Sequence, residues 1–520
     1  MLIALLLVIL AATLAPSARA QADPRPLVRA IVGQLPTAPI NPLLLPSIPR
    51  ANLLMFESLV SYGADLKPRG QLAERWEISG DGLTYTFFLR RNIRWHDGRP
   101  FAADDVVFTA RAALDERNQS RMRPYYRVAR QSVRVEKVDT HTVRFILPTP
   151  AADFLYNLSQ WNVIVPRHLL EGRDLAAAEF NARPIGTGPF RFVQLRENLF
   201  IRMVANPFYH LGRPKLDLWV DRGFEDQMAA MAALARGEVD LLALDSRHSV
   251  EIARRLPNVR IIGYNPGWIY ALNLNHKASF FGDPRVRQAL AYALDREQLA
   301  KIAGDVPVAW SLIGPPSSWM HNPNVPRYPR DIDRAKQLLA EAGFRRGPGR
   351  VLQKDGIPFR FTLLIEADAA EVDTDVLAAG LQQAFRAIGV DMLIERLDKR
   401  SLERQIFLGR EFDAFLWWNG YNFDPDPGLY WHSKTSVNNY DNPEIDRLID
   451  QAASASRPEV RRQLLDAIAT KIAKDAAFIP LYYFSRYVAI RAGLKVPPAS
   501  AADFANSGVV YDVQTIERIR

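Results

Sequence analysis

The segment LAERWEISGDGLTYTFFLRRNIRWHDGRPFAADDVVFTARAALD, residues Leu72–Asp115, contains a strand pattern followed by a helix pattern. Leu83–Arg90 alternates apolar and polar residues, which is the period of a half-buried strand. In the later part, Asp104 and Asp105 fall in the first turn of a helical pattern, where carboxylates complement the helix dipole. A second alternating stretch follows at Thr142–Leu147. The region therefore predicts strand, helix, strand, an α+β unit.

The rest of the chain also mixes strand and helix patterns. Gly186 and Gly188 stand around a turn that enters a strand, whereas a phosphate loop would enter a helix and supply a lysine, so these glycines are predicted to be structural. A helical pattern that ends at Gly237 precedes a strand at Val239–Leu244, which indicates an α/β layer. After the helix start at Asp283 the chain becomes mainly helical. Further helices and strands are expected at 331–343, 359–365, 377–387, 391–397 and 442–452.

Five segments are similar to the signature segments of one known family. They are Leu72–Asp115, IGTGPFRF (Ile185–Phe192), DPRVRQALAYALDREQLA (Asp283–Ala300), DIDRAKQLLAEAGF (Asp331–Phe344) and NNYDNPEIDRLIDQA (Asn438–Ala452). From about residue 30 to about residue 490 the chain resembles the family 5 periplasmic solute-binding proteins, which serve oligopeptide, dipeptide and nickel ABC importers.

This resemblance implies a mixed α/β fold of two lobes, with an additional inserted α/β domain and a ligand cleft between the lobes. Two segments are expected to cross between the lobes, WIYALNLN (Trp268–Asn275) and PLYYFSRY (Pro480–Tyr487). The expected division is a signal peptide at 1–20, lobe I in the three parts 21–56, 185–270 and 484–520, an inserted domain at 57–184, and lobe II at 271–483.

The first twenty residues, MLIALLLVILAATLAPSARA, have the features of a secretory signal. An apolar stretch from Leu2 to Leu14 precedes the small-x-small site Ala18-Arg19-Ala20, which predicts cleavage after Ala20. The alternative is a membrane anchor, but 13 apolar residues are fewer than the roughly 20 that a spanning helix needs. We therefore expect a soluble periplasmic protein that begins near Gln21.

Composition narrows the functional classes further. The 520 residues include no cysteine, which excludes disulfides, thiolate metal sites and a cysteine nucleophile. The net charge of +9 is spread along the chain, and no run of five like charges occurs. Dispersed charge on an exported protein favours a solvated basic surface over a nucleic-acid partner.

The mechanism that the resemblance implies is capture. A peptide or peptide-like small organic ligand binds between open lobes and stabilises the closed form, which an ABC permease in the inner membrane recognises. Members of this family are commonly monomers, so a monomer is expected. The alternatives are an exported hydrolase on the same scaffold, a ligand sensor that signals to a membrane receptor, and a nickel-chelate carrier.

Catalytic and metal-binding motifs give no support to an enzyme. The chain has no G-x-S-x-G, H-E-x-x-H or G-x-G-x-x-G motif and no S-x-x-K followed by K-T-G, so neither an enzyme nor a cofactor is expected. Its eight histidines include no pair at i, i+3 or i, i+4, so no protein-built metal site is expected. His432, beside Trp431, is a weak candidate for a chelated metal, and a packing role is favoured for it.

The stretch FLWWNGYNFDPDPGLYW, Phe415–Trp431, contains seven aromatic residues. Core packing and a ligand-binding wall both explain such a stretch. In peptide-binding members of the family, the similar segment lines the cleft, with a tryptophan that packs on the ligand and an acid three places later that pairs with the peptide ammonium. The resemblance places Trp418, with Trp417 beside it, at the tryptophan and Tyr421 at the acidic position.

Tyr421 therefore raises a question about the ligand. A buried ammonium without a carboxylate carries a large desolvation cost. Either Asp424 takes the place of the acid, or the ligand has no such amine. Asp424 is also explained as a turn-capping residue before Pro425. Asn422 lies in the same turn and is a further candidate for ligand binding.

The two crossing segments supply the remaining candidates. The resemblance implies cleft aromatics at Trp268 and Tyr270 in the first segment and at Tyr482 and Tyr483 in the second, with hinge packing as the alternative for each. Asn41, in an Ile-Asn-Pro turn, matches the stretch of the first lobe that borders the ligand in relatives.

Overall fold

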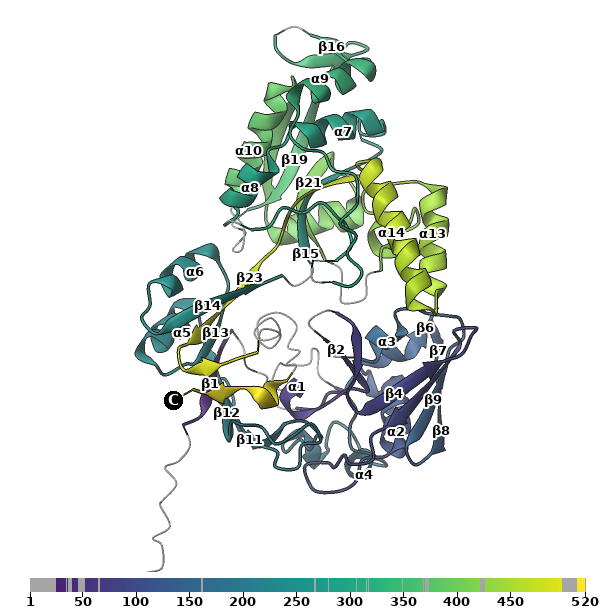
Figure 1. The fold of residues 1–520 in the computed structure, drawn as a ribbon, viewed down its shortest axis with the longest axis vertical. Helices are drawn as coiled ribbons and strands as arrows, with labels where there is room; N and C mark the ends of the chain where they lie inside the picture. Colours follow the sequence, from purple (N-terminus) through teal and green to yellow (C-terminus); the bar gives the residue numbers. More distant parts are fainter. Residues whose placement is uncertain are drawn as a thin grey trace, which may run out of the picture.

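The structure is a computed structural model, and it combines helices and sheets in three connected parts (Figure 1). The mixed α/β architecture that the sequence predicted is confirmed. The expected signal peptide, residues 1–20, lies outside the described residues. The described residues are 25–33, 35, 40–44, 52–63, 66–159, 162–265, 268–278, 280–304, 306–314, 316, 318–347, 349–367, 369, 374–420, 426–497 and 512–519.

A seven-stranded sheet joins three distant parts of the chain. Strand β1 (Leu27–Val32) lies in its middle and pairs in parallel with β12 (Leu218–Phe224) and β13 (Leu241–Leu244). Helices α5 (Gln227–Arg236) and α6 (Arg247–Arg254) cover one face. The order is β10 (Phe190–Arg196), β11 (Phe200–Ala205), β12, β1, β13, β23 (Arg486–Arg491), β14 (Val259–Tyr264).

A four-stranded antiparallel sheet contains the segment that opened the sequence argument. The predicted strands are confirmed as β5 (Thr84–Leu89) and β9 (Thr142–Ile146), and the predicted helix as α2 (Ala103–Leu114). Every second side chain of β5 is buried, as the alternation requires. The order is β4 (Ala73–Ile78), β5, β9, β8 (Arg134–Asp139), with α3 (Phe154–Asn157) and α4 (Arg167–Leu170) following in the chain.

A five-stranded sheet forms the upper part of Figure 1. Its order is β20 (Asp391–Leu397), β19 (Arg360–Glu366), β21 (Ala414–Gly420), β15 (Trp268–Leu274), β22 (Phe478–Tyr483). One face packs against α7 (Pro284–Ala293), α8 (Arg296–Ile302), α9 (Ile332–Glu341) and α10 (Thr374–Ala387). The other face packs against α11 (Lys399–Glu403), α13 (Pro443–Ser454) and α14 (Pro458–Lys474).

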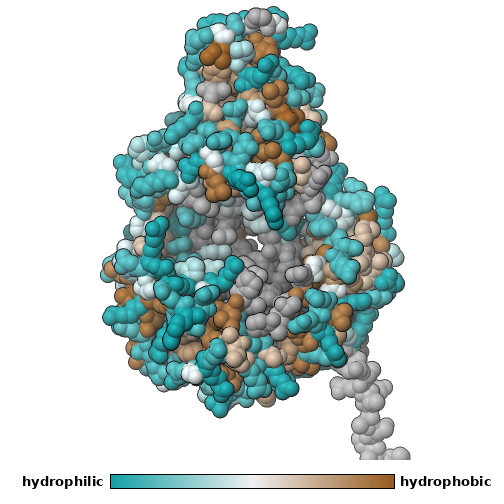
Figure 2. Space-filling view, turned by 180° about the vertical axis from the view of Figure 1, so that it is seen from behind, coloured by the Kyte–Doolittle hydropathy of each residue, from teal (hydrophilic) through white to brown (hydrophobic). Residues whose placement is uncertain are grey.

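The described structure also contains shorter elements. They are α1 (Asn52–Met55), β2 (Val60–Tyr62), β3 (Pro68–Gly70), β6 (Arg127–Val128), β7 (Gln131–Ser132), β16 (Arg345–Arg346), β17 (Leu352–Lys354), β18 (Ile357–Pro358), the π-helical segment Arg404–Gly409, α12 (Gly428–Trp431), β24 (Leu494–Lys495) and β25 (Glu517–Arg518). Seen from behind in Figure 2, the coloured surface is mostly hydrophilic, with scattered apolar areas.

The chain passes twice between the seven-stranded and the five-stranded sheets. It does so between β14 and β15, and again between β22 and β23. The first passage precedes Trp268, whereas the sequence placed the crossing within Trp268–Asn275, and the expected boundary after Tyr270 falls inside β15. All seven residues of β15 pair with β21, so Trp268 and Tyr270 already belong to the five-stranded sheet. The division into lobes and inserted domain stays a prediction.

Gly186 and Gly188 are explained by a close approach of two segments. A Cβ atom would lie 1.8 Å from the carbonyl oxygen of Met55 at Gly186, and 2.6 Å from that of Leu54 at Gly188. His96 holds the same loop, because its Nδ1 accepts from the amide of Gly186 and its Nε2 lies 3.0 Å from the carbonyl of Gly188. The structural interpretation of these glycines is therefore confirmed.

Candidate functional site

Strand β21 separates the aromatic residues of its stretch by their side. Phe415 and Trp417 pack with Leu402 and Ile406 on the face that α11 covers. Trp417 is only 6% exposed, and its contact with ligand stays a prediction. The strand period of two sends the Cβ atoms of Trp417 and Trp418 to opposite faces, yet their indoles stack, with ring centroids 5.7 Å apart and an interplanar angle of 19°. Trp418, in contrast, is half-buried.

Trp431, at the end of the same stretch, belongs to a different core. It is fully buried and contacts the rings of Tyr440 and Phe478 beneath α13 and α14. The two interpretations of the aromatic stretch thus apply to different residues. Phe415, Trp417 and Trp431 are core residues, and Trp418 remains the candidate for the wall.

The indole of Trp418 stacks on that of Trp268. The ring centroids are 4.7 Å apart, and the planes differ by 24°. Gly420, the register partner of Trp268, makes this stack possible, because a Cβ atom at position 420 would lie 2.6 Å from Cδ1 of Trp268. Trp268 is also half-buried. The structure therefore brings together two candidates from strands that are 150 residues apart in the sequence.

Tyr270 and Tyr482 form a second stacked pair on the same face. Their centroids are 5.5 Å apart, with an interplanar angle of 14°. Burial raises the pKa of both hydroxyls well above the usual value, so both keep their protons at neutral pH. The hydroxyl of Tyr482, which is 1% exposed, has no hydrogen-bond partner among the described residues.

Tyr483 points to the opposite face from Tyr482. Its side chain is 3% exposed and packs with Ile269 and Ala309, and its amide donates to the carbonyl of Pro307. Burial raises the pKa of its hydroxyl as well. The structure therefore separates Tyr483 from the stacked rings.

The two stacked pairs, Trp268–Trp418 and Tyr270–Tyr482, are called the aromatic group below. Phe484 and Arg486 extend this group toward the seven-stranded sheet. The ring of Phe484 lies 5.8 Å from that of Trp268, and the guanidinium carbon of Arg486 lies 5.1 Å from the centroid of Trp268. A cation over an indole face is attracted by the ring quadrupole. Sequence reasoning missed both residues, although both lie in the second crossing segment that it singled out.

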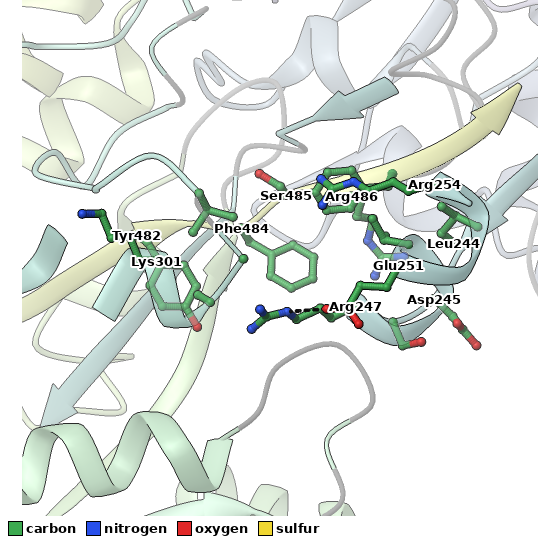
Figure 3. Close-up of a pocket in the computed structure, with 16 residues that line it drawn as sticks. Leu244, Asp245, Arg247, Glu251, Arg254, Lys301, Tyr482, Phe484, Ser485 and Arg486 are labelled. Atoms are coloured by element: carbon green, nitrogen blue, oxygen red, sulfur yellow. Dashed lines mark ion pairs between the residues drawn. The ribbon is translucent and has the colours of Figure 1, made fainter. Parts of the chain in front are cut away.

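A pocket of about 190 Å³ adjoins this aromatic group (Figure 3). Its walls come from the seven-stranded sheet and α6, from the end of α8, and from the second crossing. It contains four cationic and two acidic side chains. The lining residues are Leu244, Asp245, Ser246, Arg247, Val250, Glu251, Arg254, Lys301, Ala303, Gly304, Val306, Tyr482, Phe484, Ser485, Arg486 and Tyr487.

Arg247 connects the two sides of this pocket. Its Nη1 donates to the carbonyl of Ile302, at the end of α8, over 2.7 Å. Its Nε lies 3.3 Å from Oε1 of Glu251 on its own helix. One side chain therefore spans the space between α6 and α8. The sequence offered no signal for this contact, because Arg247 is one of many scattered basic residues.

Four further predicted residues do not join the aromatic group. Asn41 is fully buried, with its Oδ1 accepting from the amide of Leu43 and its Nδ2 donating to Asn181. These contacts explain Asn41 as a turn residue in the interior. Tyr421, Asn422 and Asp424 lie outside the described residues.

His432 sits between two carboxylates. Its Nδ1 lies 3.6 Å from Asp446 and its Nε2 3.5 Å from Asp450, and the side chain is mostly buried. No group of three or more metal-ligating residues occurs in the described part of the chain. Within that same part, no helix combines the length and the apolar character needed to cross a membrane.

Comparison with known proteins identifies the fold. The family described as bacterial extracellular solute-binding proteins, family 5 Middle, matches residues 67–441. The oligopeptide-binding protein AppA of Bacillus subtilis (strain 168) is 30% identical over 466 residues, which cover 85% of this chain and 83% of that protein. Heme-binding protein A of Haemophilus influenzae is 29% identical over 468 residues, which cover 82% and 81%.

A solved structure agrees with these relatives. The ABC transporter substrate binding protein CtaP of Listeria monocytogenes matches with a TM-score of 0.80 and 28% identity, over 96% of this chain and 100% of that one. The expected two-lobed binding-protein fold is therefore confirmed. The chain belongs to the family 5 bacterial extracellular solute-binding proteins, and it is the substrate-binding component of an ABC importer, which delivers its ligand to a membrane permease.

Proposed function

We propose that this protein captures a peptide or a peptide-like small organic ligand at the passage between its two large sheets. The observation that carries the proposal is that the half-buried Trp268–Trp418 stack and the adjoining pocket use residues from both sheets. A ligand held by both sides favours the closed arrangement through its differential contacts. A micromolar ligand has about 8 kcal/mol of binding free energy, enough to shift lobes whose forms differ by a few kcal/mol.

The binding residues that we propose fall into two groups. Trp268, Trp418, Tyr270 and Tyr482 form the stacked rings on one face of the five-stranded sheet. Tyr421, Asn422 and Asp424 follow directly after β21, and Tyr483 comes from the second crossing. Apolar rings with a few placed polar groups are the usual lining of a ligand site.

The ligand class follows from the charges in these positions. Tyr421 stands where a peptide carrier has an acid, and the described pocket holds more cations than acids. A free ammonium placed there would lose its water without gaining a full countercharge. The name of the Bacillus relative supports an oligopeptide, and that of the Haemophilus relative supports a larger organic ligand.

The proposal also covers the location of the protein, its oligomeric state and the fate of its ligand. Proteins of this family are binding proteins, and their extracellular or periplasmic location agrees with the apolar N-terminus of the chain. We infer that the signal is removed after Ala20 and that the mature protein works as a monomer with an inner-membrane ABC permease. We also infer that it releases its ligand chemically unchanged.

Native mass spectrometry of protein purified from its own periplasm tests the proposal, because it reads the bound compound directly. We expect a bound small molecule, and we expect small-angle scattering to show a more compact protein with that molecule than without it. A bound compound that emerges chemically altered would favour the hydrolase alternative. Protein that retains no small molecule and keeps one shape would contradict capture.

A further inference from the structure

We propose that the part of the protein built on the four-stranded sheet is a latch, which docks on the adjoining ends of α13 and α14 and slows ligand release. The inference rests on the proposed function and deepens it, because it assigns what controls release from that site. Figure 1 shows these helix ends next to α3, on the opposite side of the molecule from β23. The latch residues are Leu66, Gly82 and Ala152 on one side, and Trp319, Ala453 and Ser456 on the other.

The first latch contact is a hydrogen bond at the end of α13. The amide of Ala152, just before α3, donates to the carbonyl of Ala453 over 2.8 Å. Ala453 lies in the last turn of α13, where carbonyl oxygens usually have no partner within the helix. A distant part of the chain therefore satisfies an acceptor that the helix itself leaves open.

The second latch contact brings two turns together. Gly82 lies between β4 and β5, and a Cβ atom there would be 3.1 Å from the Cβ of Ser456, which lies between α13 and α14. The φ of Gly82 is 71°, in the left-handed region that favours glycine. Small residues at both positions allow the two backbones to approach this closely.

The third latch contact is made by Trp319. Its indole Nε1 donates to the carbonyl of Leu66, between β2 and β3, over 3.1 Å. Arg462 of α14 holds the loop of Trp319, because its guanidinium donates to the carbonyls of Trp319 and His321. The indole is therefore fixed to the side of α14 and reaches the other side with its polar end.

The two sides of the latch belong to separate cores. Phe87 and Phe145 of the four-stranded sheet share one hydrophobic cluster with Leu27 of β1 and Ile201 of β11, so this part is joined to the seven-stranded sheet. Residues of α13 and α14 belong to another cluster, together with Phe478 of the five-stranded sheet. Close packing makes each core resist deformation. The latch therefore joins two bodies, and the interior of neither depends on it.

This arrangement couples the latch to the ligand site. The two passages link the bodies near the aromatic group, and the latch links them on the opposite side, so movement about the passages separates Gly82 from Ser456. Two hydrogen bonds and a contact of small side chains can break without disturbing either core. Contacts that exist only in the closed form shift the population toward that form. The latch therefore prolongs ligand binding without touching the ligand.

A reversible crosslink tests whether the latch opens. The natural chain has no cysteine, so Gly82→Cys combined with Ser456→Cys permits one intramolecular disulfide. The two Cβ positions, 3.1 Å apart, need only a small shift to reach the roughly 3.5–4.5 Å of a disulfide. The protein is freed of its periplasmic compound by unfolding in urea and refolding. We then expect small-angle scattering to give a smaller radius of gyration for the oxidised double variant than for the reduced one.

Equal radii in the two states overturn the proposal, because the crosslinked turns then do not separate on opening. Gly82→Cys alone is the control for strain at a positive φ, and its radius should not respond to oxidation. A response of the same size in this single variant also overturns the proposal.

A wedge variant tests the latch without a crosslink. Ser456→Trp places a large ring against Gly82, so we expect native mass spectrometry to show at least fivefold faster loss of the co-purified compound. The melting temperature should hardly change, since Ser456 lies in a turn outside both clusters. Ser454→Trp is the matched control, because Ser454 is exposed at the end of α13. Loss at the wild-type rate in Ser456→Trp, or equal loss in both variants, overturns the proposal.

The outcome for the proposed function is read separately. If the wild-type protein closes around its compound and the crosslinked protein makes the same change of shape, the latch fails and capture stands. If the wild-type protein keeps one shape with and without its compound, capture itself fails. Closure that depends on the compound and is abolished by the crosslink supports both.

Discussion

The indole of Trp268 stacks on the indole of Trp418, with ring centroids 4.7 Å apart, at the end of the β15–β21 pair. The two rings lie at the passage between the seven-stranded and five-stranded sheets, and both are half-buried. Their neighbour Trp417 is buried in the core beneath α11, and its ring stacks on that of Trp418 at 5.7 Å. The two adjacent tryptophans therefore differ in exposure, although their rings touch.

Trp418→Ala is expected to weaken binding of the co-purified ligand at least tenfold, about 1.4 kcal/mol, because it removes a ring from the proposed site. The apo melting temperature should fall by only a few degrees. Isothermal titration calorimetry and thermal unfolding measure the two effects. Trp431→Ala is the control, and it should cost about 3–5 kcal/mol of stability, since it opens a cavity in the separate core beneath α13 and α14. An unchanged ligand affinity in Trp418→Ala would assign Trp418 to the core as well.

Gly420→Ala is expected to displace the indole of Trp268. The added Cβ would lie 2.6 Å from Cδ1 of that ring, which is closer than packed atoms allow. The stacked indoles should therefore lose their coupled near-ultraviolet circular dichroism signal, and ligand affinity should fall. Gly80→Ala is the matched control, because a Cβ there meets no atom within 4 Å. If the spectrum of Gly420→Ala stays that of the wild type, Gly420 is not what positions the stack.

Asp221→Asn should destabilise the seven-stranded sheet. Asp221 is 1% exposed and accepts from Nε of Arg29 at 2.7 Å and from Nη2 at 2.6 Å, between paired residues of β1 and β12. Removing one partner of a buried ion pair costs about 3–5 kcal/mol, because the other charge stays buried. Urea unfolding measures the loss. Glu238→Gln, which disturbs exposed pairs with Arg222 and Arg236, should change stability little, and an equal loss in both variants would refute the argument.

Acidification should destabilise the protein through His96. Burial lowers the pKa of His96 from 6.5 to about 4, and its neutral ring is held by the loop at Gly186 and Gly188. Because the folded pKa lies below the unfolded one, the unfolded chain takes up the proton first as pH falls. This stabilisation is complete above pH 6.5 and is lost between pH 6.5 and about 4. His96 alone should contribute about 1.4 kcal/mol per pH unit in this window.

Urea unfolding from pH 7.5 to pH 4 measures that slope. His276, whose pKa burial lowers to about 3, adds to the wild-type slope in the same direction. His96→Gln should therefore be less stable at pH 7.5 but lose less stability on acidification than the wild type. Parallel curves for the two proteins would show that His96 does not carry the effect.

Local sequence patterns predicted most of the regular structure. The alternation in Leu83–Arg90 is confirmed as β5, and Asn442 caps α13 by accepting from the amides of Glu444 and Ile445. Gly237 ends α5 with a left-handed φ of 81°, as a glycine stop should. These features depend on residues within one turn or one strand, so they can be read without the tertiary structure.

The functional surface could be predicted only in part. The sequence singled out Trp268, Trp418, Tyr270 and Tyr482, and the structure stacks them in two pairs. It also singled out Trp417 and Asn41, which are buried. The pocket residues Arg247 and Arg486 carried no recognisable motif, because a scattered arginine looks the same whether it faces solvent or a pocket.

By itself, the sequence determined the periods, caps and turns of the elements and the family to which the chain belongs. Only the tertiary structure decided which residues of β21 are core, and that Arg247 of α6 reaches the carbonyl of Ile302 at the end of α8. The physical reason is that a strand's period of two separates Trp417 from Trp418 without saying which face the helices will cover. The pocket joins α6 to residues more than 200 positions later, and such contacts arise from packing rather than from local pattern.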